Sequence, residues 1–350
     1  MKSPTILKKT VVAAMLFLLV SLATLFQSCH KSPTEAPPPA AVDQVFVIGT
    51  QIENDFLTTG QFGLSVLPVD ESGEAILTSD LEIRVEILEP ENITAEPEIE
   101  QLSSPSNLPL AAALSLDGSG SMVYNDPLRT RVAGAQLFVD VLETNQLPYQ
   151  ACILTYQGIP DYNNFFYTQL LSPFSGNADS LKAAIELVGQ SGATPTYESL
   201  LEILSYIDRE RPRGLYERAI VLLSDGQPNS LALRDSVCSY ANNLEIPIYT
   251  IGLGPASDIG LNDPGAVENM RFIANCTNAA YAGISETDSS SVLSIYANIA
   301  RATSKGSALV QVQMAGAGFQ TLVRGQVVNG QVTIGNESGE ATEGFSFRIP

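Results

Sequence analysis

Short apolar runs alternate with helix-patterned segments between residues 108 and 304, and this alternation constrains the fold more than any other feature. Pro109–Leu116, Ala151–Tyr156 and Ala219–Leu223 are almost wholly apolar, as expected for strands that are covered on both faces. Between them, segments such as Val132–Leu142 carry apolar residues three or four positions apart, which is typical of helices. The alternation therefore predicts an α/β fold with a mostly parallel sheet and helices on both faces.

The segments on either side, 42–107 and 305–350, have a β-rich pattern. Leu81–Ile87 alternates apolar and charged residues, which indicates a strand with one exposed face. In the C-terminal segment we expect strands at Ala308–Met314, Val323–Val328, Gln331–Ile334 and Phe345–Ile349, separated by Asn/Gly turns. We expect both segments to form one immunoglobulin-like β-sandwich into which the α/β domain, 108–304, is inserted. Two unrelated small β units are the alternative.

The N-terminus has the layout of a bacterial secretory signal. A basic start precedes the apolar stretch Val11–Phe26, which is short for a transmembrane helix of about 20 apolar residues. Cys29 follows a small residue at the end of this stretch, as in a lipoprotein lipidation site. We therefore predict a lipoprotein signal peptide at 1–28, a lipid on Cys29 and a Pro-rich tether over 29–41. These features predict a lipid-anchored protein of the bacterial cell envelope, on the outer membrane and facing the periplasm or the surface. An ordinary cleaved signal or a membrane anchor is the alternative.

The composition excludes several classes of function. The formal net charge is −20, and no cluster of Lys and Arg occurs beyond the first residues, so we expect no nucleic-acid partner. The phosphate-binding pattern G-x-x-x-x-G-K-[ST] is absent, so we expect no nucleotide partner. The only histidine is His30, in the predicted tether. A Ser-His-Asp triad, a Cys-His pair and a histidine-ligated metal centre are therefore excluded.

The chain has four cysteines, of which Cys29 is the predicted lipidation site. Cys152 lies in an apolar run and is expected to be a small buried side chain. Cys238 and Cys276 are candidates for a disulfide, because such bonds form in oxidising envelope compartments. The sequence does not decide whether these two cysteines are close, so their pairing stays open.

Oxygen-bearing side chains follow two of the buried runs. Asp117, Ser119 and Ser121 form a D-x-S-x-S pattern after the first run, and Asp225 follows the run that ends at Ser224. In an open α/β sheet, ligands bind beyond the carboxyl ends of the strands, so these residues are expected at one edge. Thr194 lies in a loop before a predicted helix, and we expect it at the same edge.

These residues supply carboxylate and hydroxyl oxygens only, which are ligands for a hard cation. We expect Mg²⁺, with Mn²⁺ or Ca²⁺ as alternatives. Hydroxyls are neutral ligands, so the cation keeps much of its positive charge and can attract a carboxylate from another molecule. Because Mg²⁺ usually keeps exchangeable positions, the set leaves room for such an outside ligand.

The three oxygen-bearing segments resemble the metal-ion-dependent adhesion site of von Willebrand factor type A (VWA) domains. The matching stretches are Asp117-Gly-Ser119-Gly-Ser121-Met122, Gly192-Ala-Thr194-Pro195 and Leu223-Ser-Asp225-Gly226. The resemblance covers roughly residues 108–304 and implies a Rossmann-like, doubly wound sheet. It implies Ser119 and Ser121 as direct ligands, Asp117 and Asp225 as ligands directly or through water, and Thr194 as a state-dependent one. The remaining ligand implied is an Asp or Glu carboxylate of a protein partner.

We therefore expect a non-enzymatic protein that binds or adheres to a partner through a divalent cation. A scaffold subunit of an envelope complex is the alternative, and a metal-assisted hydrolase is a further one. The aromatic residues of Tyr156–Tyr167 are candidates for a contact surface or for a loop with partly buried rings. The polar segment Asp258–Asp263 is a candidate for the rim of the site or for a loop without a role.

Overall fold

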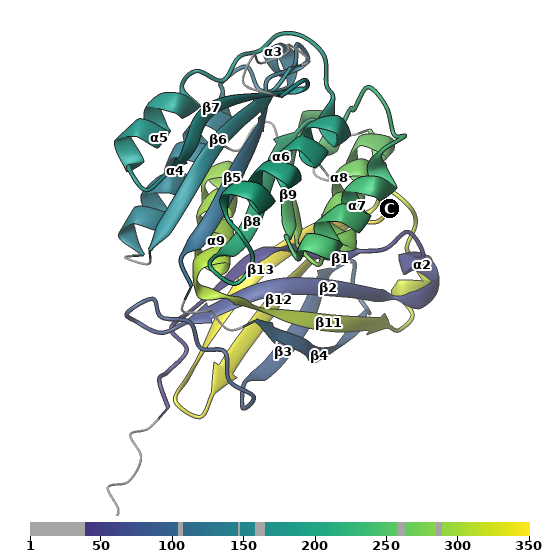
Figure 1. Ribbon diagram of the computed structural model, residues 1–350. Helices are drawn as coiled ribbons and strands as arrows, with labels where there is room; N and C mark the ends of the chain where they lie inside the picture. Colours follow the sequence, from purple (N-terminus) through teal and green to yellow (C-terminus); the bar gives the residue numbers. More distant parts are fainter. Residues whose placement is uncertain (1–38, 104–107, 146–147, 158–164, 258–262, 285–288) are drawn as a thin grey trace, which may run out of the picture. The chain divides into compact units, whose positions relative to one another are not determined.

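The computed structural model describes residues 39–103, 108–145, 148–157, 165–257, 263–284 and 289–350 (Figure 1). The predicted signal peptide, Cys29 and the tether up to residue 38 lie outside these ranges, as does most of the Asp258–Asp263 segment. Ala40–Pro350 form one compact unit. Within the described ranges, no helix has the length and apolarity needed to span a membrane.

The α/β core contains a Rossmann-like sheet. Its strands are β5 Leu110–Asp117, β6 Tyr149–Tyr156, β7 Thr168–Ser175, β8 Glu217–Ser224, β9 Ile248–Leu253 and β10 Tyr281–Ile284. They are ordered β7-β6-β5-β8-β9-β10, and all are parallel except the edge strand β7. Numbered along the core, this order is the 3-2-1-4-5-6 of doubly wound folds. The predicted α/β class with a mostly parallel sheet is confirmed.

Helices cover both faces of this sheet (Figure 1). They are α3 Met122–Asn125, α4 Thr130–Thr144, α5 Ala178–Ile185, α6 Thr196–Glu210, α7 Arg234–Leu244, α8 Pro264–Cys276 and α9 Ser289–Lys305, with a 3₁₀ turn at Gly254–Ala256. α4, α5 and α9 contribute to one buried cluster, and α6, α7 and α8 to the other. Alternate residues of β5 reach the two clusters, Leu114 the first and Ala113 the second, which explains the unbroken apolar run.

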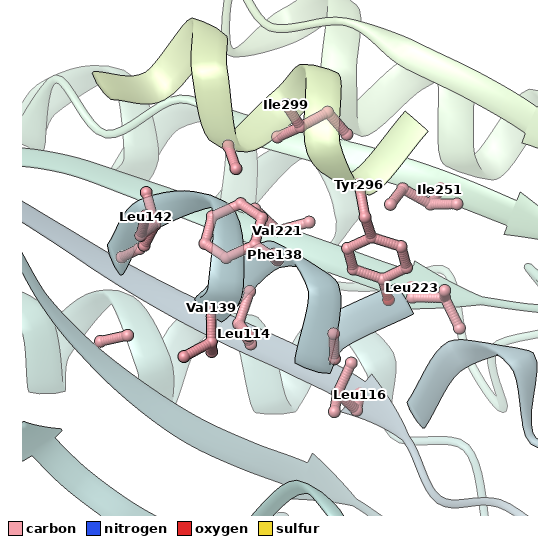
Figure 2. Close-up of a cluster of buried hydrophobic side chains, with 14 of the residues drawn as sticks. Leu114, Leu116, Phe138, Val139, Leu142, Val221, Leu223, Ile251, Tyr296 and Ile299 are labelled. Atoms are coloured by element: carbon pink, nitrogen blue, oxygen red, sulfur yellow. The ribbon is translucent and has the colours of Figure 1, made fainter. Parts of the chain in front are cut away.

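The first cluster holds α4, which follows the D-x-S-x-S segment, and α9 against the sheet. In Figure 2, Phe138 of α4 and Tyr296 of α9 lie over strand residues such as Leu114 and Leu223. All four side chains are fully buried. Burial of a Leu or Phe side chain contributes about 1.5–3 kcal/mol relative to its exposure, so this packing holds α4 and α9 firmly on the sheet.

The β-rich segments are interleaved. Their strands are β1 Gln44–Ile52, β2 Gln61–Val69, β3 Glu82–Glu89, β4 Thr94–Ser103, β11 Ser307–Ala315, β12 Val327–Asn336 and β13 Gly339–Arg348, with short helices at Phe56–Thr59 (α2) and Phe319–Thr321 (η2). C-terminal β11 lies between β2 and β4, and β12 lies between β3 and β13. Both segments also share one buried cluster, so neither forms a separate core.

The β-rich strands are connected directly to the α/β sheet. β1 pairs antiparallel with β10 through Thr50 and Tyr281, which extends the sheet to ten strands in the order β4-β11-β2-β1-β10-β9-β8-β5-β6-β7. The remaining strands form a second, three-stranded antiparallel sheet, β13-β12-β3. The α/β core and the interleaved flanks therefore share one continuous sheet.

The expected turn at Asn329-Gly330 is wrong, because β12 runs through it. A Cβ on Gly330 would come within 2.4 Å of the Phe345 ring and 2.8 Å of the Glu86 oxygen. The register of β12 against β3 also shifts between Asn329 and Gly330. Glycine here permits the close approach of neighbouring strands at a bulge, which a sequence pattern does not distinguish from a turn.

A disulfide joins two helices on one face of the core. Cys238 of α7 and Cys276 of α8 are bonded, with their Cα atoms 5.7 Å apart. Cys152 of β6 is free and buried. The pairing that the sequence left open is thus present in the structure, and it connects α7 to α8, which has its N-terminus near the site loops.

Candidate metal centre

The predicted site lies where the strand order of the core reverses. β5 and β8 are neighbours, with Leu116 paired to Leu223. The chain leaves β5 toward α4 on one face and leaves β8 toward α7 on the other. Asp117 is the last residue of β5, and Asp225 follows the last residue of β8. The two carboxylates therefore lie at the topological switch point, where doubly wound sheets bind their ligands.

The D-x-S-x-S segment folds back on its own carboxylate. The Ser119 backbone N–H donates to Asp117 Oδ1 at 2.8 Å, and the Ser119 and Ser121 hydroxyls lie 3.0 Å apart. Asp117 and Ser119 are buried, whereas Ser121 is partly exposed at the start of α3. The segment thus presents its hydroxyl oxygens together, with the carboxylate beneath them.

The carboxylates of the two strands are held by separate donors. The Ser224 hydroxyl donates to Asp117 Oδ2 at 2.7 Å, which joins β8 to β5 directly below the site. The side-chain amide of Asn125 donates to Asp225 Oδ2 at 2.9 Å, and the Gln227 N–H donates to Asp225 Oδ1 at 3.3 Å. Asp225 is therefore tied to both the α3 segment and its own loop.

The Thr194 loop is fastened to the other two segments through its backbone. The Gly120 N–H donates to the Gly192 carbonyl at 3.1 Å. The Thr194 N–H donates to Asn229 Oδ1 at 3.1 Å, and the Thr194 carbonyl accepts from the Asn229 N–H at 3.0 Å. Gly192 has φ +96°, and a Cβ there would come within 2.2 Å of the Gln157 carbonyl, so glycine is required. The structure brings all three segments together, and the Thr194 side chain is largely buried among them.

Two buried carboxylates at this point are electrostatically unfavourable. Asp117 and Asp225 are both fully buried. Burial raises the pKa of Asp117 to about 6, and the negative charge of Asp225 adds to the shift, against the lowering effect of hydrogen bonds from Ser119 and Ser224. Neither carboxylate forms an ion pair with a Lys or Arg in the described part of the chain. The site therefore has an excess of negative charge that a bound cation would offset.

The donor chemistry fits a hard cation. No group of three or more His, Cys, Asp or Glu side chains is assembled in the ranges that the structure describes, so a site here depends on hydroxyl oxygens. The Tyr156 and Thr196 hydroxyls are also buried, and neither makes a hydrogen bond of good geometry with a described residue, although Tyr156 lies near Thr196 and Ser224. Burial raises the pKa of Tyr156 well above its usual value, with the charge of Asp117 as a further cause, so its hydroxyl stays a donor beside the site. Such donors suit ligand waters of a metal.

The structure adds residues that sequence patterns did not single out. Ser224, Asn125 and Asn229 hold the predicted ligands in place, and Tyr156 is paired with Asp117 on the neighbouring strand. Ser224 precedes Asp225 at a strand end, which is a weak signal for a role in the site. No sequence pattern indicates a role in the site for Asn125 or Asn229, because Asn is common in turns.

Neither a protein-family model nor a curated protein matches the chain. Among solved structures, the pilus adhesin SpaC of Lactobacillus rhamnosus GG is 12% identical with a TM-score of 0.45, over 77% of this chain and 47% of SpaC. The vWF domain of the type V pili tip protein Mfa5 of Porphyromonas gingivalis is 14% identical with a TM-score of 0.44, over 55% and 94%. An aerotolerance-related membrane protein of Bacteroides fragilis is 16% identical with a TM-score of 0.41, over 54% and 98%.

The topology of this chain identifies the fold of its α/β core. Its core has the reversed strand order, the antiparallel edge strand β7 and helices on both faces. The three motif segments meet at the carboxyl ends of β5 and β8 in the order that the resemblance implies. The α/β core of this chain therefore has the von Willebrand factor type A fold.

Proposed function

We propose that this chain binds a protein partner through a divalent cation, with Mg²⁺ preferred over Mn²⁺ or Ca²⁺. Asp117, Ser119, Ser121, Thr194 and Asp225 would hold the cation, directly or through water. A bound cation supplies positive charge and a position for an Asp or Glu carboxylate of the partner. The observation that carries the proposal is the pair of buried carboxylates at the switch point, for which no Lys or Arg of the described residues forms a balancing ion pair.

The geometry favours binding over catalysis. Hydrolysis by paired carboxylates needs both groups to reach the substrate, yet Asp117 and Asp225 are fully buried. Their oxygens accept hydrogen bonds from Ser119, Ser224 and Asn125. The hydroxyl oxygens above them are ligands without an adjacent base, since the only histidine lies in the predicted tether. These features support an adhesion or binding role.

An envelope location is part of the proposal. The disulfide between Cys238 and Cys276 forms readily only in an oxidising compartment. This agrees with the predicted signal peptide at 1–28 and the predicted lipid on Cys29. In the proposed arrangement the tether 29–41 holds the folded unit away from the membrane and leaves the metal site free to meet a partner.

Metal-dependent capture tests the proposed function. The purified chain is immobilised and incubated with envelope extract in MgCl₂ or in EDTA, in parallel with the Asp117→Ala variant. We expect a partner to be retained in Mg²⁺, released by EDTA and absent with Asp117→Ala. Asp43→Asn is the matched control, because Asp43 is an exposed acid on the β-rich segment. Equal retention by wild type and Asp117→Ala in both buffers would favour a scaffold without a metal role.

A further inference from the structure

The exposed apolar side chains of this molecule are unevenly distributed. Several of the large ones in the described residues lie in the three loops that surround the metal centre. They are Val123, Tyr124, Leu128, Phe166, Tyr167 and Leu231, and we call them the apolar rim. Large apolar side chains that are exposed in a group mark interaction surfaces, whereas single ones are ordinary.

The first part of the rim belongs to the α3 segment. Tyr124 is 84% exposed and Leu128 is 78% exposed. The Tyr124 N–H donates to the carbonyl of the predicted ligand Ser121 at 3.0 Å. The next residue, Asn125, donates to Asp225 at 2.9 Å. Tyr124 is thus fixed between two connections to the metal centre while its ring extends into solvent.

The second part lies just before β7. Phe166 is 73% exposed, and the N–H groups of Phe166 and Tyr167 donate to the Glu202 carboxylate of α6 at 2.7 and 3.1 Å. The adjacent Thr168 pairs with Tyr156, whose neighbour on β5 is Asp117. Adjacent strands lie about 4.8 Å apart, so Thr168 is about 10 Å from Asp117 along the sheet edge. The segment that carries these two residues therefore lies beside the proposed metal centre on the β7 side.

The third part follows β8. Leu231 is exposed on the loop that contains Asn229, and Asn229 exchanges two hydrogen bonds with Thr194. The loops after β5 and β8, which hold predicted oxygen ligands, and the segment before β7 thus each carry an exposed apolar side chain. A partner whose carboxylate reached the metal would contact these side chains at the same time.

We propose that the partner surface is a protein segment whose acidic residue is flanked by aromatic and aliphatic side chains. This inference rests on the proposed function and names the partner class for the same site. With a net charge of −20, the chain repels acidic segments in general, so only the cation attracts the carboxylate. The apolar rim carries no charge, and it would supply the remaining affinity and the selectivity by burying matching side chains.

The chemistry of the rim favours protein over carbohydrate. Sugars need hydrogen-bond partners for their hydroxyls, yet only Tyr124 and Tyr167 offer a polar atom at the rim. Val123, Leu128 and Leu231 are aliphatic and match other apolar side chains. Apolar side chains, aromatic ones above all, are enriched in the buried core of protein–protein contacts.

A peptide library tests this inference with the full chain. Displayed random peptides with a fixed central Asp are selected on the immobilised chain in MgCl₂ and eluted with EDTA. We expect Phe, Tyr, Leu, Ile and Val to be enriched next to the Asp. We expect the double variant Tyr124→Ser/Leu128→Ser to bind the selected peptides at least about 30-fold more weakly, as for residues at the centre of an interface.

The control variant is Leu215→Ser/Val323→Ser, which removes two apolar side chains that are also exposed, 61% each, but lie outside the rim. We expect it to bind the peptides within about twofold of wild type, as for surface changes outside the contact. Selected peptides without apolar enrichment, equal binding by the rim variant, or Mg²⁺-dependent binding to a glycan array without peptide enrichment would each overturn the inference. Calorimetry with MgCl₂ alone distinguishes a failure of the proposed function from a failure of the inference about the apolar rim. An absence of metal binding refutes the proposed function itself, whereas metal binding without apolar selection refutes the apolar rim alone.

Discussion

Two buried carboxylate clusters contact the α3 segment, and their charges are balanced differently. Asp126, which follows α3, accepts a hydrogen bond from the fully buried Arg131 guanidinium at 2.6 Å. It also accepts from the Thr130 backbone and hydroxyl at 2.6 Å. Within the described residues, Asp117 and Asp225 accept hydrogen bonds from neutral donors alone.

Within a few residues, the chain thus holds one buried carboxylate whose charge is balanced and two whose charges are not. The Asp126 cluster is balanced in charge, because its negative charge has a positive partner, and Arg131 donates further to the Gly189 carbonyl at 2.9 Å. It fixes the start of α4 against the loop that leads to Thr194. The Asp117 cluster has no positive partner among the described residues, and buried uncompensated charge is costly. Substitutions should therefore act on stability in the first cluster and on metal binding in the second.

The largest effect is expected from Arg131→Met. This change leaves the Asp126 carboxylate buried without its partner, and breaking a buried pair in this way costs about 3–5 kcal/mol. The measurement is the free energy of unfolding from urea denaturation. Arg209→Met is the matched control, since its ion pair with Glu210 is exposed, and such pairs contribute roughly 0–1 kcal/mol. Equal losses of unfolding free energy in the two variants would show that the buried Asp126–Arg131 pair contributes no more to stability than an exposed pair.

Metal addition should act on the other cluster. Mg²⁺ at about 100 times its dissociation constant should stabilise the wild-type chain by about 2.7 kcal/mol, because it binds only the folded state. Urea denaturation in MgCl₂ and in EDTA measures this difference. Asp117→Ala should show the same stability in both buffers. A Mg²⁺-dependent gain that survives Asp117→Ala would place the cation elsewhere.

Ser224→Ala should lower the affinity of the proposed site for Mg²⁺ without abolishing binding. The Ser224 hydroxyl orients Asp117 by donating at 2.7 Å, and loss of such an orienting group typically lowers metal affinity about 10–100-fold. Titration calorimetry with MgCl₂ gives the ratio of dissociation constants. Ser103→Ala, at an exposed serine on β4, is the control and should leave affinity unchanged. An unchanged Ser224→Ala affinity would exclude Asp117 from the metal's surroundings.

The same substitution should have opposite signs in the two clusters. In EDTA, Asp225→Asn removes the charge that opposes Asp117 and should raise the free energy of unfolding by roughly 1 kcal/mol. Asp126→Asn removes the partner of Arg131 and should lower that free energy. Urea denaturation of both variants measures the two signs. Destabilisation of similar size in both would contradict the difference in charge balance.

Sequence patterns predicted the α/β core because strands covered on both faces must be continuously apolar, as in Pro109–Leu116. They placed Asp117 and Asp225 at one edge because parallel strands share their carboxyl ends. β7 and β4 were missed. Thr168–Ser175 is only half buried, and Thr94–Ser103 carries Glu and Pro, which suit an edge strand but hide its pattern.

The polar contacts around the site could not be predicted in the same way. From the sequence, Arg131 would be expected on the exposed face of a helix and Asp126 in a solvent-exposed loop. Both are buried in the structure. Their pairing depends on how α4 packs against the sheet. Asn125 and Asn229 likewise acquire their roles only when distant segments meet. The charge balance of each cluster is thus a tertiary property.

Titration calorimetry of MgCl₂ into wild type and Asp117→Ala tests the central claim most directly. The charge imbalance at Asp117 and Asp225 predicts one saturable site in the wild type. It predicts no binding in the variant, because a direct or water-linked ligand and half of the negative charge are gone. Equal Mg²⁺ binding by the two proteins would contradict the account.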